Sequence, residues 1–225
     1  MQVGAVRHIL ESDDIGIDQY TQGGRIAIFL GLSDEDPTFN FIAAMFYQCL
    51  FDRLMRATRT LPGQTLPRPL HCMLDEFANV GRIPSFERLI ATIRSRGISA
   101  SIIIQNLAQL KTMYKDGWET ILGNCDSILF LGGNEQSTTE WISKRLGKAT
   151  IDTKDHSESK GRSGSTTTNY RRLGRELMTP DELGHLDNRE CIYMLRGLNP
   201  FKSRKNTPDK PARRPHSTLR RATNN

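Results

Sequence analysis

Short apolar runs alternate along this chain with stretches in which apolar residues recur at helical spacing. The runs predict strands at residues 25–32, 70–75, 99–104, 126–131 and 191–195. Between them the spacing predicts helices at residues 39–60, 84–96, 135–146 and 180–186. It also predicts a helical stretch that follows the run at 99–104 and ends at about residue 124. Strands that are apolar throughout and separated by helices are typical of a parallel sheet covered on both faces. We therefore expect an α/β fold with a mostly parallel sheet flanked by helices.

Several residues mark where the predicted helices begin and end. Asp36 and Pro37 fit the N-cap and first position of the helix at 39–60. Gly97 is expected to end the second helix, and Gly147 the fourth, because glycine adopts the left-handed conformation that follows a helix.

The positive charge of the chain lies at its C-terminal end. Residues 200–225 contain eight Lys or Arg and one Asp, a net of +7, which leaves −1 for residues 1–199. The tail has four prolines and no apolar period, so we expect it to be disordered. The expected organisation is a lead-in at 1–24, a globular part at 25–199 with a mobile Ser/Thr/Lys/Gly-rich loop at 153–169, and the basic tail at 200–225.

Cysteine spacing and hydropathy exclude several classes of protein. The four cysteines are far apart and form no C-x-x-C pair, which argues against a zinc site or a disulfide framework. No apolar run reaches the 18 or so residues that span a bilayer. We therefore expect this chain by itself to be soluble and cytoplasmic, without membrane insertion.

The run at residues 70–75 ends in two adjacent carboxylates, Asp75 and Glu76. In open α/β sheets ligands bind beyond the carboxyl ends of the strands. An Asp there can hold Mg²⁺ through water, and a neighbouring Glu can activate a water molecule against a γ-phosphate. The stretch is thus a candidate Walker B motif, although apolar runs also end in Asp-Glu at ordinary strand exits.

Two further polar features accompany the next strand. Gln105 follows the run at 99–104, where a neutral amide can hydrogen-bond a phosphate oxygen. Arg94 and Arg96 lie on opposite edges of the apolar stripe of the preceding helix, and either can reach a phosphate. The alternative is that both arginines only interact favourably with the helix dipole.

The segments "LDEFANVGRIPSFERLIATIRSRGISASIIIQNLAQL", "YKDGWETILGNCDSILFLGG" and "LGKATID" resemble the TraG/TraD family of type IV secretion coupling proteins. The similarity covers roughly residues 25–200. It implies a RecA-like hexameric ATPase that recruits relaxase-bound single-stranded DNA and delivers it to a secretion channel at the cytoplasmic side of the bacterial membrane. By this resemblance Asp75 binds the nucleotide through the metal ion, and Gln105 binds the nucleotide and senses its γ-phosphate. Glu76 and Arg94 are the catalytic residues by the same resemblance. Arg94 matches an arginine finger, which acts on the nucleotide of the neighbouring subunit.

One motif of an ATPase is missing from these 225 residues. No G-x-x-x-x-G-K-[ST] sequence occurs, and the only Gly-Lys pair, Gly147-Lys148, is followed by Ala149. The resemblance places the P-loop and the membrane anchor before the matching region. We therefore expect a C-terminal portion of a coupling protein, from a truncated gene or an expressed piece of one. ATP and Mg²⁺ belong to the intact protein, and this chain alone is expected to bind neither and to be inactive.

Basic and aromatic residues indicate weaker candidates for DNA contact. Lys111, Tyr114 and Lys115 can follow a DNA backbone and stack on bases, or they can form a helix connection around a buried Trp. In the tail, Arg213 and Arg214 can neutralise DNA phosphates, attract an anionic membrane, or keep the tail soluble.

Two functions of other classes remain open. One is a non-enzymatic adaptor that binds DNA, relaxase or secretion-channel proteins. The other is a hexameric DNA translocase of the chromosome-segregation type.

Overall fold

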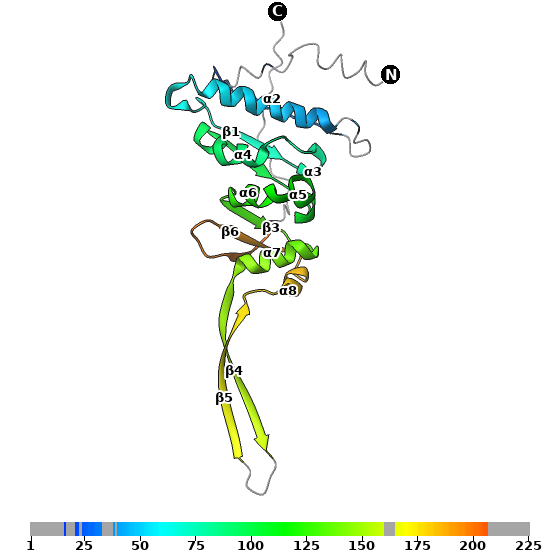
Figure 1. The fold of residues 1–225 in the computed structure, drawn as a ribbon, viewed down its shortest axis with the longest axis vertical. Helices are drawn as coiled ribbons and strands as arrows, with labels where there is room; N and C mark the ends of the chain where they lie inside the picture. Colours follow the sequence, from blue (N-terminus) through cyan, green and yellow to red (C-terminus); the bar gives the residue numbers. More distant parts are fainter. Residues whose placement is uncertain are drawn as a thin grey trace, which may run out of the picture. The chain divides into compact units, whose positions relative to one another are not determined.

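The computed structural model describes residues 24–32, 40–159 and 165–206, together with residues 16, 21–22 and 38. Between residues 152 and 171 it describes backbone pairing but no side chains. The chain divides into two compact units, Met1–Asp126 and Ser127–Asn225 (Figure 1). The stretch predicted as one globular part therefore contains two units.

The first unit is built around a parallel strand pair. Its elements are α2 (Asn40–Thr58), η3 (Pro62–Gln64), β1 (Leu70–Leu74), α3 (Phe77–Val80), α4 (Phe86–Thr92), η4 (Ile93–Arg96), β2 (Ile98–Ile102), α5 (Leu107–Tyr114), η5 (Lys115–Gly117) and α6 (Trp118–Gly123). Strands β1 and β2 run parallel, with Leu70 opposite Ile98 and Leu74 opposite Ile102. These positions confirm the strands predicted at 70–75 and 99–104 and the helices predicted around them.

The core of the first unit lies between the strand pair and the helices. Phe51 from α2, Phe77 from α3 and Phe86 from α4 are each at most 2% exposed. The ring centroids of Phe77 and Phe86 lie 5.0 Å apart. Burial of one such side chain contributes about 1.5–3 kcal/mol, so this aromatic cluster is a main source of stability.

Gly97 ends the α4–η4 segment as predicted. Its backbone is left-handed, at φ 75° and ψ 23°, and its N–H donates to the carbonyls of Ile93 and Arg94. A β-carbon at this position would lie 2.8 Å from Oγ1 of Thr65. Glycine therefore meets both the conformation and the space that this turn requires.

The predicted strand at residues 25–32 is not formed. The chain there carries no strand pairing in the described structure. Ile26 and Leu32 still pack against the core, but Phe29 is 93% exposed. Apolar periodicity alone does not make a strand, because its backbone groups need a neighbouring strand as hydrogen-bond partner. Asp36 and Pro37, predicted to start α2, lie outside the described residues.

The second unit contains an antiparallel sheet covered by two helices. Its elements are β3 (Ser127–Phe130), α7 (Gln136–Leu146), β4 (Lys148–Ser159), β5 (Ser165–Glu176), α8 (Pro180–Gly184), β6 (Glu190–Leu195) and β7 (Phe201–Arg204). The strand order of the sheet is β3-β6-β7, and both pairings are antiparallel. Phe130, Ile142, Leu183 and Ile192 form its core.

The segment predicted as a loop at 153–169 is a strand pair in its described parts. Twelve residue pairs join β4 and β5, from Lys148↔Glu176 to Ser159↔Ser165, and Figure 1 shows them as a long twisted ribbon. The sequence shows no apolar alternation here, since both strands are mostly polar. Backbone hydrogen bonding and the strand preference of threonine make the ribbon instead.

The segment predicted as a disordered tail begins with a strand. Phe201–Arg204 form β7, and Lys202 Nζ lies 2.7 Å from Glu190 Oε2 on the neighbouring strand. The prediction of disorder from residue 200 is therefore wrong for these four residues, because their pairing with β6 is a tertiary contact that composition does not reveal. Residues 207–225, including Arg213 and Arg214, lie outside the described part.

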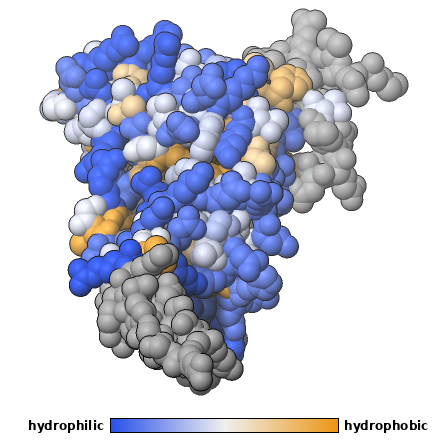
Figure 2. Space-filling view, turned by 60° about the horizontal axis from the view of Figure 1, so that its bottom comes forward, coloured by the Kyte–Doolittle hydropathy of each residue, from blue (hydrophilic) through white to orange (hydrophobic). Residues whose placement is uncertain are grey.

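The surface seen in Figure 2 is mainly hydrophilic, with small separate hydrophobic patches. Among the described residues, no helix combines the length and the apolar character that a bilayer span needs.

Candidate active site

The two carboxylates predicted at the end of a strand occupy a sharp turn directly after β1. Asp75 follows Leu74, the last residue of the strand, and its Oδ1 accepts a 3.0 Å hydrogen bond from the backbone N–H of Glu76. Glu76 is left-handed, at φ 45° and ψ 47°. Such a conformation costs a non-glycine residue on the order of 1 kcal/mol or more, and residues under this kind of strain cluster at functional sites. Both carboxylates are exposed.

A neighbouring amide holds the Glu76 side chain. Nδ2 of Asn79, one turn later in α3, donates a 2.6 Å hydrogen bond to Glu76 Oε2. This contact fixes the direction of one carboxylate oxygen and leaves Oε1 to face solvent or a ligand. Sequence analysis missed Asn79, although its position three residues after a candidate catalytic acid was a usable signal.

Gln105 lies at the same edge of the strand pair as the carboxylates. The pairing of β1 with β2 continues past both strands, since Ile103 N donates to Leu74 O and Phe77 N donates to Ile103 O, each at 3.0 Å. Gln105 follows two residues later and is exposed. Its backbone N–H donates to Oε1 of Gln109 at 3.1 Å. The structure thus brings Asp75, Glu76 and Gln105 to the carboxyl ends of adjacent parallel strands.

Arg94 lies at the other end of the strand pair. It belongs to η4, which leads into the first residue of β2. A strand of five residues is roughly 15 Å long, so Arg94 is well separated from Asp75 in the same chain. Its Nη1 lies 3.1 Å from Oδ2 of Asp126, and its side chain is 83% exposed.

Arg96, the other arginine considered for phosphate contact, is hydrogen-bonded to a neighbouring loop of the same chain. Its Nη1 donates to the backbone carbonyl of Gln64 at 3.0 Å and to the side-chain Oε1 of Gln64 at 2.7 Å. These bonds hold the loop before β1 against the end of η4. Of the two arginines, Arg94 is therefore the one whose guanidinium is directed to solvent.

The three residues predicted to contact DNA between α5 and α6 differ in their surroundings. Tyr114 is only 3% exposed, its ring stacks on Phe77 at 6.0 Å, and its hydroxyl accepts a 3.1 Å bond from Ile83 N. The prediction that Tyr114 stacks on bases is therefore wrong, because the ring belongs to the core. Lys111 Nζ lies 4.8 Å from the centre of the Trp118 ring, and Lys115 is exposed.

The donor set at the strand ends fits a magnesium ion held through water. Two exposed carboxylates and an amide oxygen are hard oxygen ligands, which Mg²⁺ prefers, and their exposure leaves room for the waters that this ion retains. Among the described residues no group of three or more His, Cys, Asp or Glu is placed to bind a metal directly.

Comparison with known families decides the relationship of this chain. Residues 69–188, just over half of the chain, match the family described as "TraM recognition site of TraD and TraG". The chain belongs to this family. The matching residues include Asp75, Glu76, Arg94 and Gln105, so all four candidate residues lie in the part that defines the TraG/TraD membership.

Relatives of known name agree with the TraG/TraD assignment. The chain is 28% identical over 183 residues to the protein VirD4 of Agrobacterium fabrum, which covers 80% of this chain and 27% of VirD4. It is 26% identical over 200 residues to the conjugal transfer protein TraG of the same organism, covering 86% of this chain and 29% of TraG. The chain thus spans little more than a quarter of these relatives.

Solved structures of a coupling protein share the fold. The conjugative coupling protein TrwB, without its first 70 residues, superposes with a TM-score of 0.57 at 19% identity, over 74% of this chain and 38% of that one. TrwB in complex with ADP and Mg²⁺ gives a TM-score of 0.55 at 18% identity. The predicted RecA-like α/β fold is thereby confirmed.

Proposed function

We propose that this chain is part of a conjugative coupling ATPase and carries the hydrolytic half of its nucleotide site. The observation that supports this most is the placement of Asp75, Glu76 and Gln105 at the carboxyl ends of two adjacent parallel strands. This is the edge at which open α/β sheets bind ligands. Membership of the TraG/TraD family and the ADP and Mg²⁺ bound by TrwB agree with it.

In this proposal each side chain has one role in phosphoryl transfer. A magnesium ion supplies charge neutralisation on the phosphates when bound, and Asp75 holds its water shell. Glu76, oriented by Asn79, accepts a proton from the attacking water through its remaining oxygen. Gln105 hydrogen-bonds the γ-phosphate and reports its loss through its link to Gln109 in α5.

Arg94 acts on the nucleotide of a neighbouring subunit. It lies at the opposite end of the strand pair from Asp75, so it does not reach the site of its own chain. Its exposed guanidinium is suited to stabilise charge on a transferring phosphoryl group supplied from outside. This role requires an oligomer, and we propose the hexamer implied by the resemblance.

The substrate and partners proposed for the complete protein follow the family. They are relaxase-bound single-stranded DNA, a type IV secretion channel, and a protein of the TraM kind, after the name of the matching family. The place of action is the cytoplasmic side of the plasma membrane. VirD4 and TraG, the named relatives, are the reason for choosing conjugation over chromosome segregation.

One observation favours a second function. These 225 residues contain no P-loop, so a non-enzymatic adaptor that binds DNA, relaxase or channel proteins is the alternative. The purified chain is expected to show no Mg²⁺-dependent ATP turnover above that of the Glu76→Gln variant. The two functions separate when the chain is combined with a P-loop-bearing segment, because only the ATPase half restores turnover that depends on Glu76.

A further inference from the structure

The exposed guanidinium of Arg94 has a carboxylate partner 32 residues later in the chain. Its Nη1 lies 3.1 Å from Oδ2 of Asp126, the residue directly before β3. The Arg94 side chain is 83% exposed, whereas that of Asp126 is 42% exposed. The contact joins one terminal nitrogen to one carboxylate oxygen, so it leaves most of the guanidinium uncovered.

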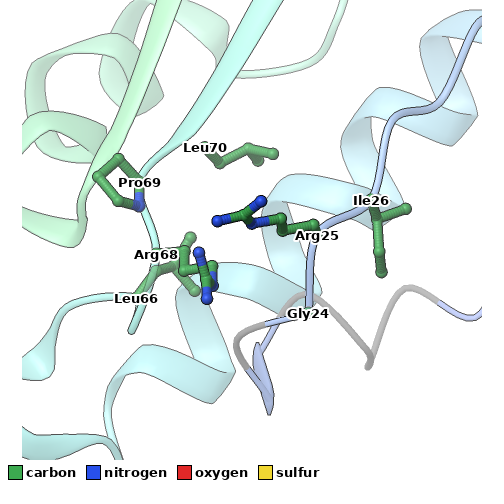
Figure 3. Close-up of a pocket in the computed structure, with 7 residues that line it drawn as sticks. All are labelled: Gly24, Arg25, Ile26, Leu66, Arg68, Pro69 and Leu70. Carbon is green, nitrogen blue, oxygen red and sulfur yellow. The ribbon is translucent and has the colours of Figure 1, made fainter. Parts of the chain in front are cut away.

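The backbone that carries Arg94 is held in place by the segment before β1. Leu66 N donates to Arg96 O at 3.0 Å. Leu70 N donates to Gly97 O at 2.9 Å. Figure 3 shows Leu66 and Leu70 in this segment, where they line one side of a pocket of about 340 Å³. The two bonds hold the end of η4, so the Arg94 side chain moves on a fixed base.

The backbone that carries Asp126 is held in place by the end of α6. Cys125 N, directly before Asp126, donates to Leu122 O at 3.1 Å. Ile121, one residue earlier in the same helix, is fully buried in the core of the first unit. Because both backbones are fixed, the rotamers of the two side chains decide whether the ion pair forms.

An ion pair of this strength can orient the guanidinium without trapping it. A long side chain at a surface samples many rotamers, and only some of them direct the guanidinium to one place. An exposed pair raises the population of the paired rotamers by up to about 5-fold. A phosphate competes well with one carboxylate oxygen, because guanidinium groups bind phosphate through two parallel hydrogen bonds. The pair with Asp126 uses one terminal nitrogen and leaves the other N–H groups for such a ligand.

We propose that Asp126 is a positioning residue for Arg94. It holds the guanidinium at the surface that meets the neighbouring subunit, so that the remaining N–H groups are presented to the nucleotide bound there. This role rests on the proposed function, in which Arg94 acts as an arginine finger. The opposite role, in which Asp126 restrains Arg94, would require a contact that covers the donors of the guanidinium, and the 83% exposure of the side chain argues against it.

The pairing itself is tested in the full 225-residue chain by NMR of the Arg94 Nε–Hε group. Asp126→Asn keeps the shape of the side chain and removes its charge. It is expected to lower the order parameter of the Arg94 side chain, while Asp126→Glu keeps part of the order. Asp116→Asn, at an exposed acid of η5, is the matched control and should change nothing. An unchanged Arg94 signal in Asp126→Asn would overturn the proposal.

The effect on the reaction is measured as ATP turnover of the assembled enzyme. Asp126→Asn is expected to lower kcat about 3- to 5-fold with little change in KM for ATP, as loss of a surface ion pair predicts. In an Arg94→Ala background the same substitution should have no further effect, which separates positioning of Arg94 from a structural role. Raising the salt concentration from about 0.05 M to about 1 M should remove the difference, because an exposed pair is screened.

Thermal unfolding curves check that the Asp126 variants remain folded. The proposal is overturned if Asp126→Asn leaves kcat unchanged, or raises it, in an enzyme that Arg94→Ala inactivates. If Arg94→Ala itself leaves turnover unchanged, the arginine finger of the proposed function is wrong and the positioning role falls with it. The Arg94→Ala variant therefore distinguishes failure of the inference from failure of the proposed function.

Discussion

The side-chain amide of Asn79 donates a 2.6 Å hydrogen bond to Oε2 of Glu76, directly beyond the end of β1. This bond gives the proposed catalytic carboxylate one fixed orientation although the side chain is exposed. Glu76 also has a left-handed backbone, at φ 45° and ψ 47°, so the chain turns directly after the strand. Position and orientation of the acid are thus set by two separate features of the turn.

Asn79→Ala is expected to slow ATP turnover of the completed site about 10- to 100-fold, because a misoriented base loses its alignment with the attacking water. Since Asn79 does not contact the nucleotide in this account, KM for ATP is expected to change little. Asn124→Ala is the matched control, because Asn124 also makes a local side-chain bond, to Thr120 O at 2.8 Å. A change in KM with unchanged kcat would assign Asn79 to binding instead.

Arg94→Ala is expected to leave stability nearly unchanged, because the exposed ion pair with Asp126 contributes about 0–1 kcal/mol. Turnover of the assembled enzyme is expected to fall about 10³-fold or more, as loss of an arginine finger predicts. Arg88→Ala, exposed on α4, is the control for loss of charge.

Mixing two inactive variants tests whether Arg94 acts on a neighbouring subunit. Subunits with Arg94→Ala and subunits with Glu76→Gln are each expected to be inactive alone. Together they form some sites that hold an intact Glu76 from one subunit and an intact Arg94 from the next, so activity should partly return. Absence of any recovery in confirmed mixed oligomers would place Arg94 outside the reaction.

Most of the helices and the parallel strand pair of the first unit could be predicted from sequence, because local spacing determines them. The apolar stripe of α2, the run ending at Asp75 and the glycine at position 97 are all short-range signals. The location of Asp75 and Gln105 at one edge of the strand pair could also be predicted, because the carboxyl ends of parallel strands lie at the same side of a sheet.

Features that depend on distant partners could not be predicted in the same way. Residues 25–32 have the apolar pattern of a strand but no strand pairing, whereas the polar β4–β5 ribbon pairs without such a pattern. Tyr114 lies between two lysines in the sequence, which suggested a DNA-contacting surface, yet its ring packs in the core beside Phe77. In each case the deciding contact joins residues whose relation is not visible in a short window of sequence.

Tyr114→Phe is expected to destabilise the first unit by about 1–3 kcal/mol, because the buried N–H of Ile83 loses its acceptor. Affinity for single-stranded DNA is expected to stay the same, since the ring is in the core. Urea unfolding and an oligonucleotide titration measure the two quantities. Tyr193→Phe, at a half-buried ring packed against Phe201, is the control.

Burial raises the pKa of Tyr114 to about 12 and that of the Cys72 thiol to about 11. The unfolded chain then loses these protons at lower pH than the folded one, so the free energy of unfolding is expected to fall as pH rises above about 9. Cys72→Ala should remove most of this slope between pH 9 and 11. An unchanged slope in that variant would show that other groups cause it.

The most direct measurement is Mg²⁺-dependent ATP turnover by a purified complex of this chain with a P-loop-bearing segment of a coupling protein. The complex is first isolated by size exclusion and shown to bind ATP. The account predicts turnover that Glu76→Gln lowers about 100-fold or more with ATP still bound, while Glu119→Gln, an exposed acid in the first turn of α6, has no effect. Equal turnover with and without Glu76, or none in a complex that binds ATP, would contradict it.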